Sequence, residues 1–251
     1  MSVAVAHELS RIDFVSGEET HIYLFSLRRL ADEESEKESI ALMGSAELEA
    51  LARIKAPHRR MEFLYGRATL RRLLAIYGGT AAEGIMINHD SGGKPCAKTF
   101  NEHWIPVFNV SHSGDVLAIA VSPHGQVGID VEQADRKLGN DLENIAKRHF
   151  SLEEWRTLEA TPSESRLDVF FRMWTLKEAI LKAVGVGLFH PLANINVAGV
   201  KRRYSISVCF KGKEGLVEAE YLQVVATGVH IAVARLDSLK TLRVFDKIRG
   251  A

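Results

Sequence analysis

Two carboxylates stand close together at the end of an apolar stretch, in the segment VGIDVEQ at residues 127–133. Asp130 and Glu132 are two residues apart, and in a β-strand such residues project from the same face. Adjacent carboxylates repel each other unless a cation lies between them, and Mg²⁺ prefers carboxylate, water and phosphate oxygens. The pair therefore predicts a magnesium site, although an edge strand whose acidic residues face water would show the same pattern.

A second group of polar residues follows in FRMWTLKEAILKAVG, at residues 171–185. Apolar residues recur there at helical spacing, while Glu178 and Lys182 are four residues apart and share a face. Glu178 would add a third carboxylate to the magnesium site, and Lys182 would neutralise a phosphate one turn further on. The structural alternative is a solvated Glu–Lys pair worth about 0.3–0.5 kcal/mol. Lys177 interrupts the apolar stripe at a position where a core residue is expected.

Composition limits the function classes. The chain has 251 residues with 32 basic and 32 acidic side chains, so its net charge gives no reason to expect a nucleic-acid or membrane partner. Its two cysteines lie far apart, at residues 96 and 209, which argues against a zinc site or a disulfide framework. The longest apolar runs have the length of strands. We therefore expect a cytoplasmic protein that does not span a membrane.

The order of the expected elements predicts an α+β fold built of two halves. A strand at residues 21–27 and a long helix at residues 56–79 are followed by short strands up to residue 122. The second half begins with the strand at residues 127–133, continues with helices, and ends with four strand-like runs: residues 194–200, 204–210, 220–226 and 230–236. We expect two similar halves, 1–124 and 125–251, that meet at the turn SPHGQ.

Two helix starts carry capping signals. Ser151 with Glu154 fits a capping box, which is a sufficient structural reason for a glutamate at that position. In the run TPSE, Thr161 is expected to cap the long helix and Pro162 to occupy its first position.

The chain resembles the phosphopantetheinyl transferases of the surfactin-synthetase-activating type. Their two signature blocks are present as VGIDVE at residues 127–132 and WTLKEAILK at residues 174–182. Two supporting blocks occur in the same order, GGKP at residues 92–95 and FNVSHSG at residues 108–114. The likeness extends from about residue 53 to about residue 197.

This resemblance implies a monomer of two similar α+β halves with the active site in the cleft between them. It implies transfer of the phosphopantetheine arm of coenzyme A to a serine of an apo acyl or peptidyl carrier protein, with release of adenosine 3′,5′-bisphosphate. Carried over by position, the magnesium ligands are Asp130, Glu132 and Glu178, and Glu178 is also the candidate base. Residues that would bind coenzyme A are Arg53, Gly93, Lys94, Ser111, His112 and Lys182.

Two other functions remain open from the sequence. A magnesium-dependent hydrolase of coenzyme A or of a nucleotide pyrophosphate would need the same metal site, with water as nucleophile. A non-catalytic carrier-protein binder would not need the four charged residues of the two signature blocks. Carrier domains tend to be acidic around the modified serine, so we expect a basic or apolar docking surface, to which residues 201–203 could contribute.

Overall fold

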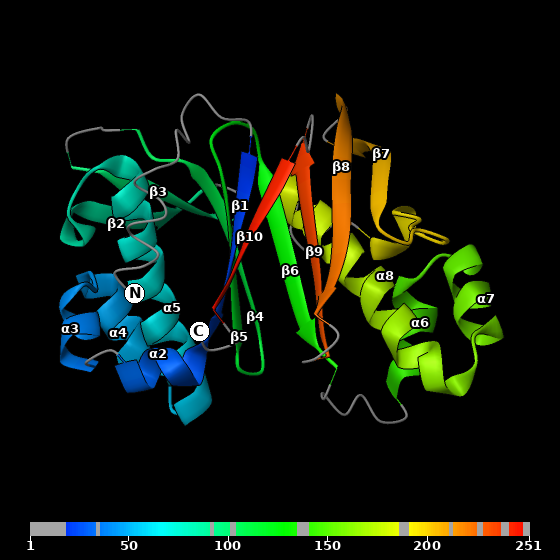
Figure 1. Cartoon of the computed structure of the whole chain (residues 1–251), viewed down its shortest axis with the longest axis horizontal. Helices are drawn as coiled ribbons and strands as arrows, with labels where there is room; N and C mark the ends of the chain where they lie inside the picture. The colour runs from blue at the N-terminus through cyan, green and yellow to red at the C-terminus, as the bar shows by residue number, and fades with distance from the viewer. Residues whose placement is uncertain are drawn as a thin grey trace.

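The computed structural model describes residues 19–33, 36–90, 93–100, 104–134, 141–185, 191–210, 213–224, 228–236 and 241–247. Two β-sheets lie face to face in the middle of the molecule, and helices cover the outer face of each sheet (Figure 1). Apolar side chains from both sheets fill the space between them. The described elements therefore form four layers: helices, sheet, sheet and helices.

The first sheet has the strand order β10-β1-β5-β4. These strands span Glu19–Ser26 (β1), Val107–Ser113 (β4), Val116–Ser122 (β5) and Thr241–Lys247 (β10). β1 runs antiparallel to β5 but parallel to β10, so this sheet includes a segment from late in the sequence. Around it lie the helices Leu27–Glu33 (α2), Glu36–Ala41 (α3), Ser45–Arg53 (α4) and Pro57–Gly78 (α5), the short helix Ala82–Gly84 (η1), and the hairpin Ile85–His89 (β2) and Pro95–Thr99 (β3).

The second sheet has the strand order β6-β9-β8-β7. Its strands span Val127–Gln133 (β6), Arg203–Phe210 (β7), Lys213–Val224 (β8) and Val229–Leu236 (β9), all antiparallel to their neighbours. The helices of this half are Asp141–His149 (α6), Leu152–Ala160 (α7) and Ser163–Val184 (α8), with the short helix Leu192–Asn194 (η3). α8 lies along the outer face of the sheet (Figure 1).

Alternation along β1 divides its side chains between two cores. Ile22 and Leu24 face the second sheet, while Tyr23 and Phe25 face the helices around α5. A strand with both faces covered needs apolar residues at every position, which explains continuous runs such as VLAIAVS in β5.

β6 and α8 approach each other so closely at Gly128 that no side chain fits between them. A Cβ atom on Gly128 would lie 2.1 Å from the carbonyl oxygen of Ala179 and 2.3 Å from the amide nitrogen of Ala183. Glycine therefore allows the backbone of α8 to pack directly on the strand. This contact fixes the position along β6 at which the polar residues of α8 meet the strand.

The α+β class predicted from the sequence is confirmed, whereas the similarity of the two halves and their boundary at residue 124 stay predictions. The expected strand at residues 194–200 is wrong: this segment contains part of η3 and bends, and its Ile195 carbonyl and Val197 N–H bind a buried ion pair instead of a sheet. The expectation for Thr161 is also wrong, because α8 starts at Ser163 with Pro162 as its N-cap. β10 was not predicted.

We expect Gly128→Ala to lower the free energy of unfolding by about 3 kcal/mol or more, because backbone atoms on both elements must move to admit the methyl group. Urea denaturation measures this loss. The matched control is Gly66→Ala in α5, where the added Cβ would lie 3.8 Å from Leu117 and an alanine favours the helix. Equal stability of the Gly128 variant and the wild type would contradict the close packing of α8 on β6.

Candidate active site

β6 forms the edge of the second sheet and carries both carboxylates of the VGIDVE block. Asp130 is buried, with 5% of its surface exposed, and Glu132 is partly buried. In the register with β9 they stand opposite Ala232 and His230 respectively. Residues two apart in a strand point to the same side, so both carboxylates face the same side of the sheet.

α8 brings a cation to this pair. The Lys182 ammonium donates hydrogen bonds to Asp130 Oδ1 at 2.7 Å, to Ser111 Oγ at 3.1 Å and to the Ile129 carbonyl at 3.1 Å. Its three partners come from β4 and β6, so one side chain of α8 joins both sheets. The structure therefore brings together Lys182 and Asp130, two residues of the predicted site.

We call the place where Lys182 meets β4 and β6 the carboxylate junction. The carboxylates there, Asp130, Glu132 and Glu178, repel each other and are poorly hydrated. Burial raises the pKa of Asp130, and Lys182 opposes this shift. Burial also raises the pKa of Glu178, with a further contribution from the nearby charges of Asp130 and Glu132, while Lys182 acts in the opposite direction. Glu178 therefore lies within the electrostatic field of both β6 carboxylates.

The donors at this junction are carboxylate oxygens, the ligand type that a divalent cation such as Mg²⁺ prefers. Asp130 Oδ2 is a buried oxygen with no hydrogen-bond partner, and a bound cation would supply the missing interaction. Mutual repulsion among Asp130, Glu132 and Glu178 would also be relieved. Within the described part of the chain, however, no three such groups lie close enough together to enclose a metal ion. The convergence of all three carboxylates on one cation stays a prediction.

The edge strand β4 of the first sheet covers the exposed backbone edge of β6 with three polar side chains. Asn109 Oδ1 accepts a hydrogen bond from the Ile129 N–H at 2.9 Å, Ser111 Oγ from the Val131 N–H at 3.3 Å, and Ser113 Oγ from the Gln133 N–H at 3.2 Å. We call these three residues, Asn109, Ser111 and Ser113, the β4 polar row.

Two members of the β4 polar row also hold the carboxylates. Ser111 Oγ donates to Asp130 Oδ1 at 3.0 Å, and Ser113 Oγ donates to Glu132 Oε2 at 2.7 Å. Each serine therefore binds the backbone and a side chain of β6 at once. The row fixes both the strand and the directions of its acidic side chains.

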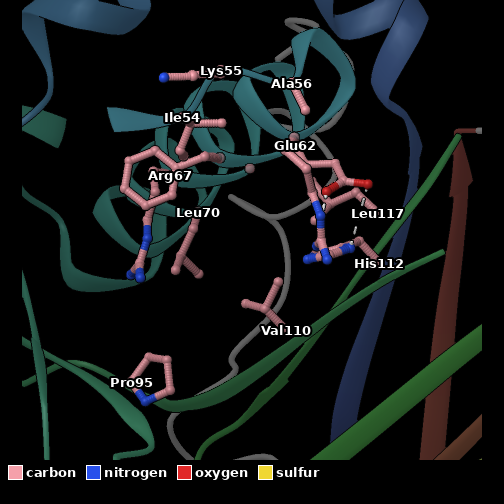
Figure 2. Close-up of a pocket in the computed structure, with 13 residues that line it drawn as sticks. Ile54, Lys55, Ala56, Glu62, Arg67, Leu70, Pro95, Val110, His112 and Leu117 are labelled. Atoms are coloured by element: carbon pink, nitrogen blue, oxygen red, sulfur yellow. Dashed lines mark hydrogen bonds and ion pairs between the residues drawn. The ribbon is translucent and has the colours of Figure 1, made fainter. Parts of the chain in front are cut away.

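On the other side of β4, a pocket of about 540 Å³ opens between α5 and the first sheet. Cationic groups from Lys55, Arg59 and Arg67 line it together with the imidazole of His112 and one carboxylate, Glu62. Figure 2 shows Glu62 and His112 facing each other, and His112 Nδ1 lies 3.8 Å from Glu62 Oε1. Apolar side chains supply the remaining lining, among them Phe63, Leu70, Val110 and Leu117. The pocket therefore suits a ligand with anionic groups and an apolar body.

The pocket is electrostatically connected to the carboxylate junction. Burial lowers the pKa of His112, Glu62 opposes this, and the positive charges of Arg59 and Lys182 lower it further. Neighbours in a strand point to opposite faces, so Ser111 reaches β6 while His112 lines the pocket. A ligand that extends past the edge of β4 would meet both places.

The residues predicted to bind coenzyme A lie in several places, although Lys182 contacts both Ser111 and Lys94. His112 lines the pocket, whereas Ser111 belongs to the β4 polar row. Arg53 is exposed at the end of α4, where the next two residues line the pocket. Gly93 has a φ of 83° in the turn before β3, and Lys94 binds β6 and α8. Their roles toward a ligand stay predictions.

Several residues of the site were not predicted from the sequence, among them Asn109 and Ser113 of the β4 polar row. With Ser111, which was predicted as a ligand-binding residue, they form the pattern N-x-S-x-S on one face of a strand, and this period of two could have indicated a polar contact. Arg59 and Glu62 lie three residues apart in α5 and form an ion pair at 3.3 Å. Nothing in the helix sequence distinguishes them from solvated residues.

Glu154 and Lys177 form a buried ion pair that is separate from this junction. Both side chains are fully buried, and the Lys177 ammonium lies 2.6 Å from Glu154 Oε1. Glu154 also accepts hydrogen bonds from the N–H groups of Ser151 and Val197. The predicted capping box is confirmed. With both of its oxygens bound inside the protein, Glu154 holds α7, α8 and the segment after η3 together.

Comparison with known proteins decides the family. The sequence profile described as the 4′-phosphopantetheinyl transferase superfamily matches residues 126–234. The chain is 36% identical to the 4′-phosphopantetheinyl transferase HetI of Nostoc sp. over 172 residues, which are 68% of this chain and 70% of that protein. The chain belongs to the 4′-phosphopantetheinyl transferase superfamily. The segment that matches the superfamily profile contains Asp130, Glu132, Glu178 and Lys182, whereas the residues that line the pocket precede it.

Two further relatives cover smaller parts. A putative 4′-phosphopantetheinyl transferase of Synechocystis sp. is 34% identical over 148 residues, 59% of each chain. The L-aminoadipate-semialdehyde dehydrogenase-phosphopantetheinyl transferase of Rattus norvegicus is 38% identical over 131 residues, 50% of this chain and 42% of that protein. Superfamily membership thus rests on HetI, because that match covers more than two thirds of the relative's length. None of the described helices is both long and apolar enough to span a bilayer.

We expect Asn109→Ala to accelerate hydrogen exchange at the amide of Ile129 and to lower the free energy of unfolding by about 1–3 kcal/mol, because that buried N–H loses its acceptor. Residue-resolved exchange measured by NMR reports the effect, and the Val131 amide should change less, since Ser111 still covers it. An exposed serine of β7 supplies the control variant, Ser205→Ala. Unchanged exchange at Ile129 would argue against the β4 polar row.

Lys177→Met should lower the free energy of unfolding by about 3–5 kcal/mol, because the Glu154 carboxylate would remain buried without its cation. Chemical denaturation measures the loss, and the double variant Lys177→Met/Glu154→Gln should recover part of it. The control is Lys147→Met, which breaks an exposed ion pair with Glu143 and should cost less than about 1 kcal/mol. A loss as small as that of the control would contradict the structural role of the pair.

Proposed function

We propose that this protein transfers the 4′-phosphopantetheine group of coenzyme A to a serine hydroxyl of an apo acyl or peptidyl carrier protein and releases adenosine 3′,5′-bisphosphate. The main structural support is a single arrangement: Lys182 binds Asp130 where the two sheets meet, Glu178 lies within the electrostatic influence of Asp130 and Glu132, and a pocket with several cations lies on the other side of β4. Superfamily membership and the activities in the names of the relatives support the same reaction.

The pocket would hold the nucleotide end of coenzyme A. Its apolar lining suits an adenine ring, and Lys55, Arg59 and His112 are placed to bind phosphate oxygens. Glu62 holds Arg59 by an ion pair, which limits the conformations of the guanidinium before the ligand arrives. A nucleotide bound there would direct its pyrophosphate past His112 toward Lys182.

The junction would carry out the phosphoryl transfer. The serine oxygen forms a bond with the phosphorus that carries the pantetheine arm, and the bond from this phosphorus to the bridging oxygen breaks. The leaving adenosine 3′,5′-bisphosphate takes the electron pair of that bond. Lys182 would exchange part of its contact with Asp130 for a phosphate oxygen and stabilise the negative charge that develops there.

Glu178 is the candidate base for the serine proton. In the metal-free protein, burial and the charges of Asp130 and Glu132 raise the pKa of Glu178, so this carboxylate accepts a proton more readily than an exposed one. Asp130, Glu132 and Glu178 are the residues that would hold Mg²⁺, which when bound would neutralise charge on the phosphates. The orphaned Oδ2 of Asp130 supports this assignment. Binding of the metal by all three residues is part of the proposal.

The test of the reaction is intact-protein mass spectrometry of an apo carrier protein incubated with the purified protein, coenzyme A and Mg²⁺. We expect the carrier to gain the mass of one phosphopantetheine group, and omission of Mg²⁺ or addition of a chelator to prevent the gain. A parallel sample without carrier protein measures hydrolysis of coenzyme A. Cleavage at the same rate in that sample, with an unmodified carrier, would replace the transferase by a pyrophosphate hydrolase.

Glu178→Gln and Asp130→Asn, made separately, should each lower the rate of carrier modification by about 10²-fold or more, because a base or a charge at the reacting phosphates is lost. Calorimetric titration with Mg²⁺ should show weaker binding by both variants than by the wild type. Glu159→Gln, an exposed glutamate of α7, is the control. Full activity and unchanged magnesium binding in both variants would remove the proposed metal site.

A further inference from the structure

Lys94 lies at the point where the β2–β3 hairpin of the first half meets the second half. Its ammonium donates hydrogen bonds to Gln126 Oε1 at 3.0 Å, to the Val127 carbonyl at 2.8 Å and to the Lys182 carbonyl at 2.9 Å. These acceptors belong to the first residue of β6, to the residue before it and to the last turn of α8. One side chain therefore connects a hairpin, a strand and a helix.

The three contacts use all the hydrogen-bonding capacity of the group. A lysine ammonium has three N–H donors and no acceptor, so no N–H of Lys94 is left over for a phosphate in this arrangement. The residues that line the nucleotide pocket include the next residue, Pro95, but not Lys94. A direct contact with coenzyme A would require breaking at least one of the present bonds.

The contact with Lys182 has a specific consequence for α8. The last four carbonyls of an α-helix have no partner within the helix, and the negative end of the helix dipole lies there. α8 ends at Val184, so the Lys182 carbonyl is one of these groups. A cation that binds it stabilises the last turn and holds it against β6.

The hairpin is built to hold Lys94 in this position. The Lys94 N–H donates to Asp90 Oδ1 at 2.9 Å, and the Asp90 N–H donates to the Lys94 carbonyl at 2.9 Å. Gly93 has a φ of 83°, a conformation that other residues rarely adopt, and its N–H donates to the Asp90 carbonyl at 3.0 Å. The backbone of Lys94 is therefore fixed before its side chain reaches across.

We propose that Lys94 is a positioning residue for the proposed transfer reaction: it binds the end of α8 to the start of β6 and so fixes Lys182 relative to Asp130. This inference rests on the proposed function for its catalytic consequence, but not for its structural one. Lys182 uses its side chain at the junction and its carbonyl for Lys94, so loss of the Lys94 ammonium loosens the turn that carries the phosphate-binding group.

The first experiment is hydrogen exchange by mass spectrometry on the protein without coenzyme A or metal. In Lys94→Met, which keeps the aliphatic stem, we expect peptides covering residues 178–185 to exchange at least about 3-fold faster than in the wild type, because a helix end without a capping partner frays. Lys98→Met is the control, since it removes an exposed lysine of the same hairpin. Unchanged exchange in Lys94→Met would overturn the proposal, whether or not the protein is a transferase.

The second experiment separates positioning from ligand binding. Positioning predicts that Lys94→Met lowers kcat about 10-fold or more at saturating coenzyme A, with the KM for coenzyme A changed less than about 2-fold. A raised KM with an unchanged kcat would show that Lys94 contacts coenzyme A directly, and would overturn the proposal. If Lys94→Met fails to fold, Gln126→Ala takes its place, because it removes one acceptor of the Lys94 ammonium. We expect the same changes in exchange and in kcat, each smaller than in Lys94→Met. Wild-type protein without transferase activity would refute the proposed function and leave the exchange result standing.

Discussion

The backbone edge of β6 that has no neighbouring strand is the constraint on which the site depends. An edge strand leaves alternate N–H and C=O groups without partners in its sheet, and two sheets stacked face to face cannot supply them by ordinary strand pairing. Here side chains take the place of a neighbouring strand. The β4 polar row accepts from the N–H groups of Ile129, Val131 and Gln133, while two ammonium groups bind the carbonyls of Val127 and Ile129. The same contacts join the two sheets and orient the acidic residues, so stability and the proposed chemistry share one set of bonds.

This sharing explains why the junction is so strongly charged. Each polar group placed there to cover the edge must be satisfied in a partly buried environment, and Lys182 accordingly binds Asp130 as well as a carbonyl. Asp130 and Glu178 remain poorly solvated, which raises their pKa values. A substrate with a pyrophosphate and a metal ion would bring the charges that this environment lacks. The Glu154–Lys177 pair shows the opposite solution, because its charges are matched internally and it has no remaining capacity for a ligand.

Local patterns predicted the α+β class and brought Asp130, Glu178 and Lys182 into one candidate site, because signature blocks and helical spacing report on short segments. They failed where a distant partner decides the structure. The segment around Ile195 has strand-like residues, but its backbone is used by the buried ion pair. The β4 polar row consists of ordinary polar residues until β6 is placed beside it. Pocket residues such as Arg59 depend on the packing of α5 against the first sheet, which no spacing within the helix reveals.

The parallel pairing of β10 with β1 concerns how the chain reaches its final form on the ribosome. β1 lies near the beginning of the described sequence and β10 at its end, with every other described element between them. As the polypeptide emerges, β1 can pair with β5 early, but its other edge stays open until β10 has been synthesised. The nascent first sheet therefore has one unpaired strand edge while the second sheet is being synthesised. The sheet is completed only when β10 pairs with β1. Because these strands lie far apart in the sequence, this pairing is a slow step.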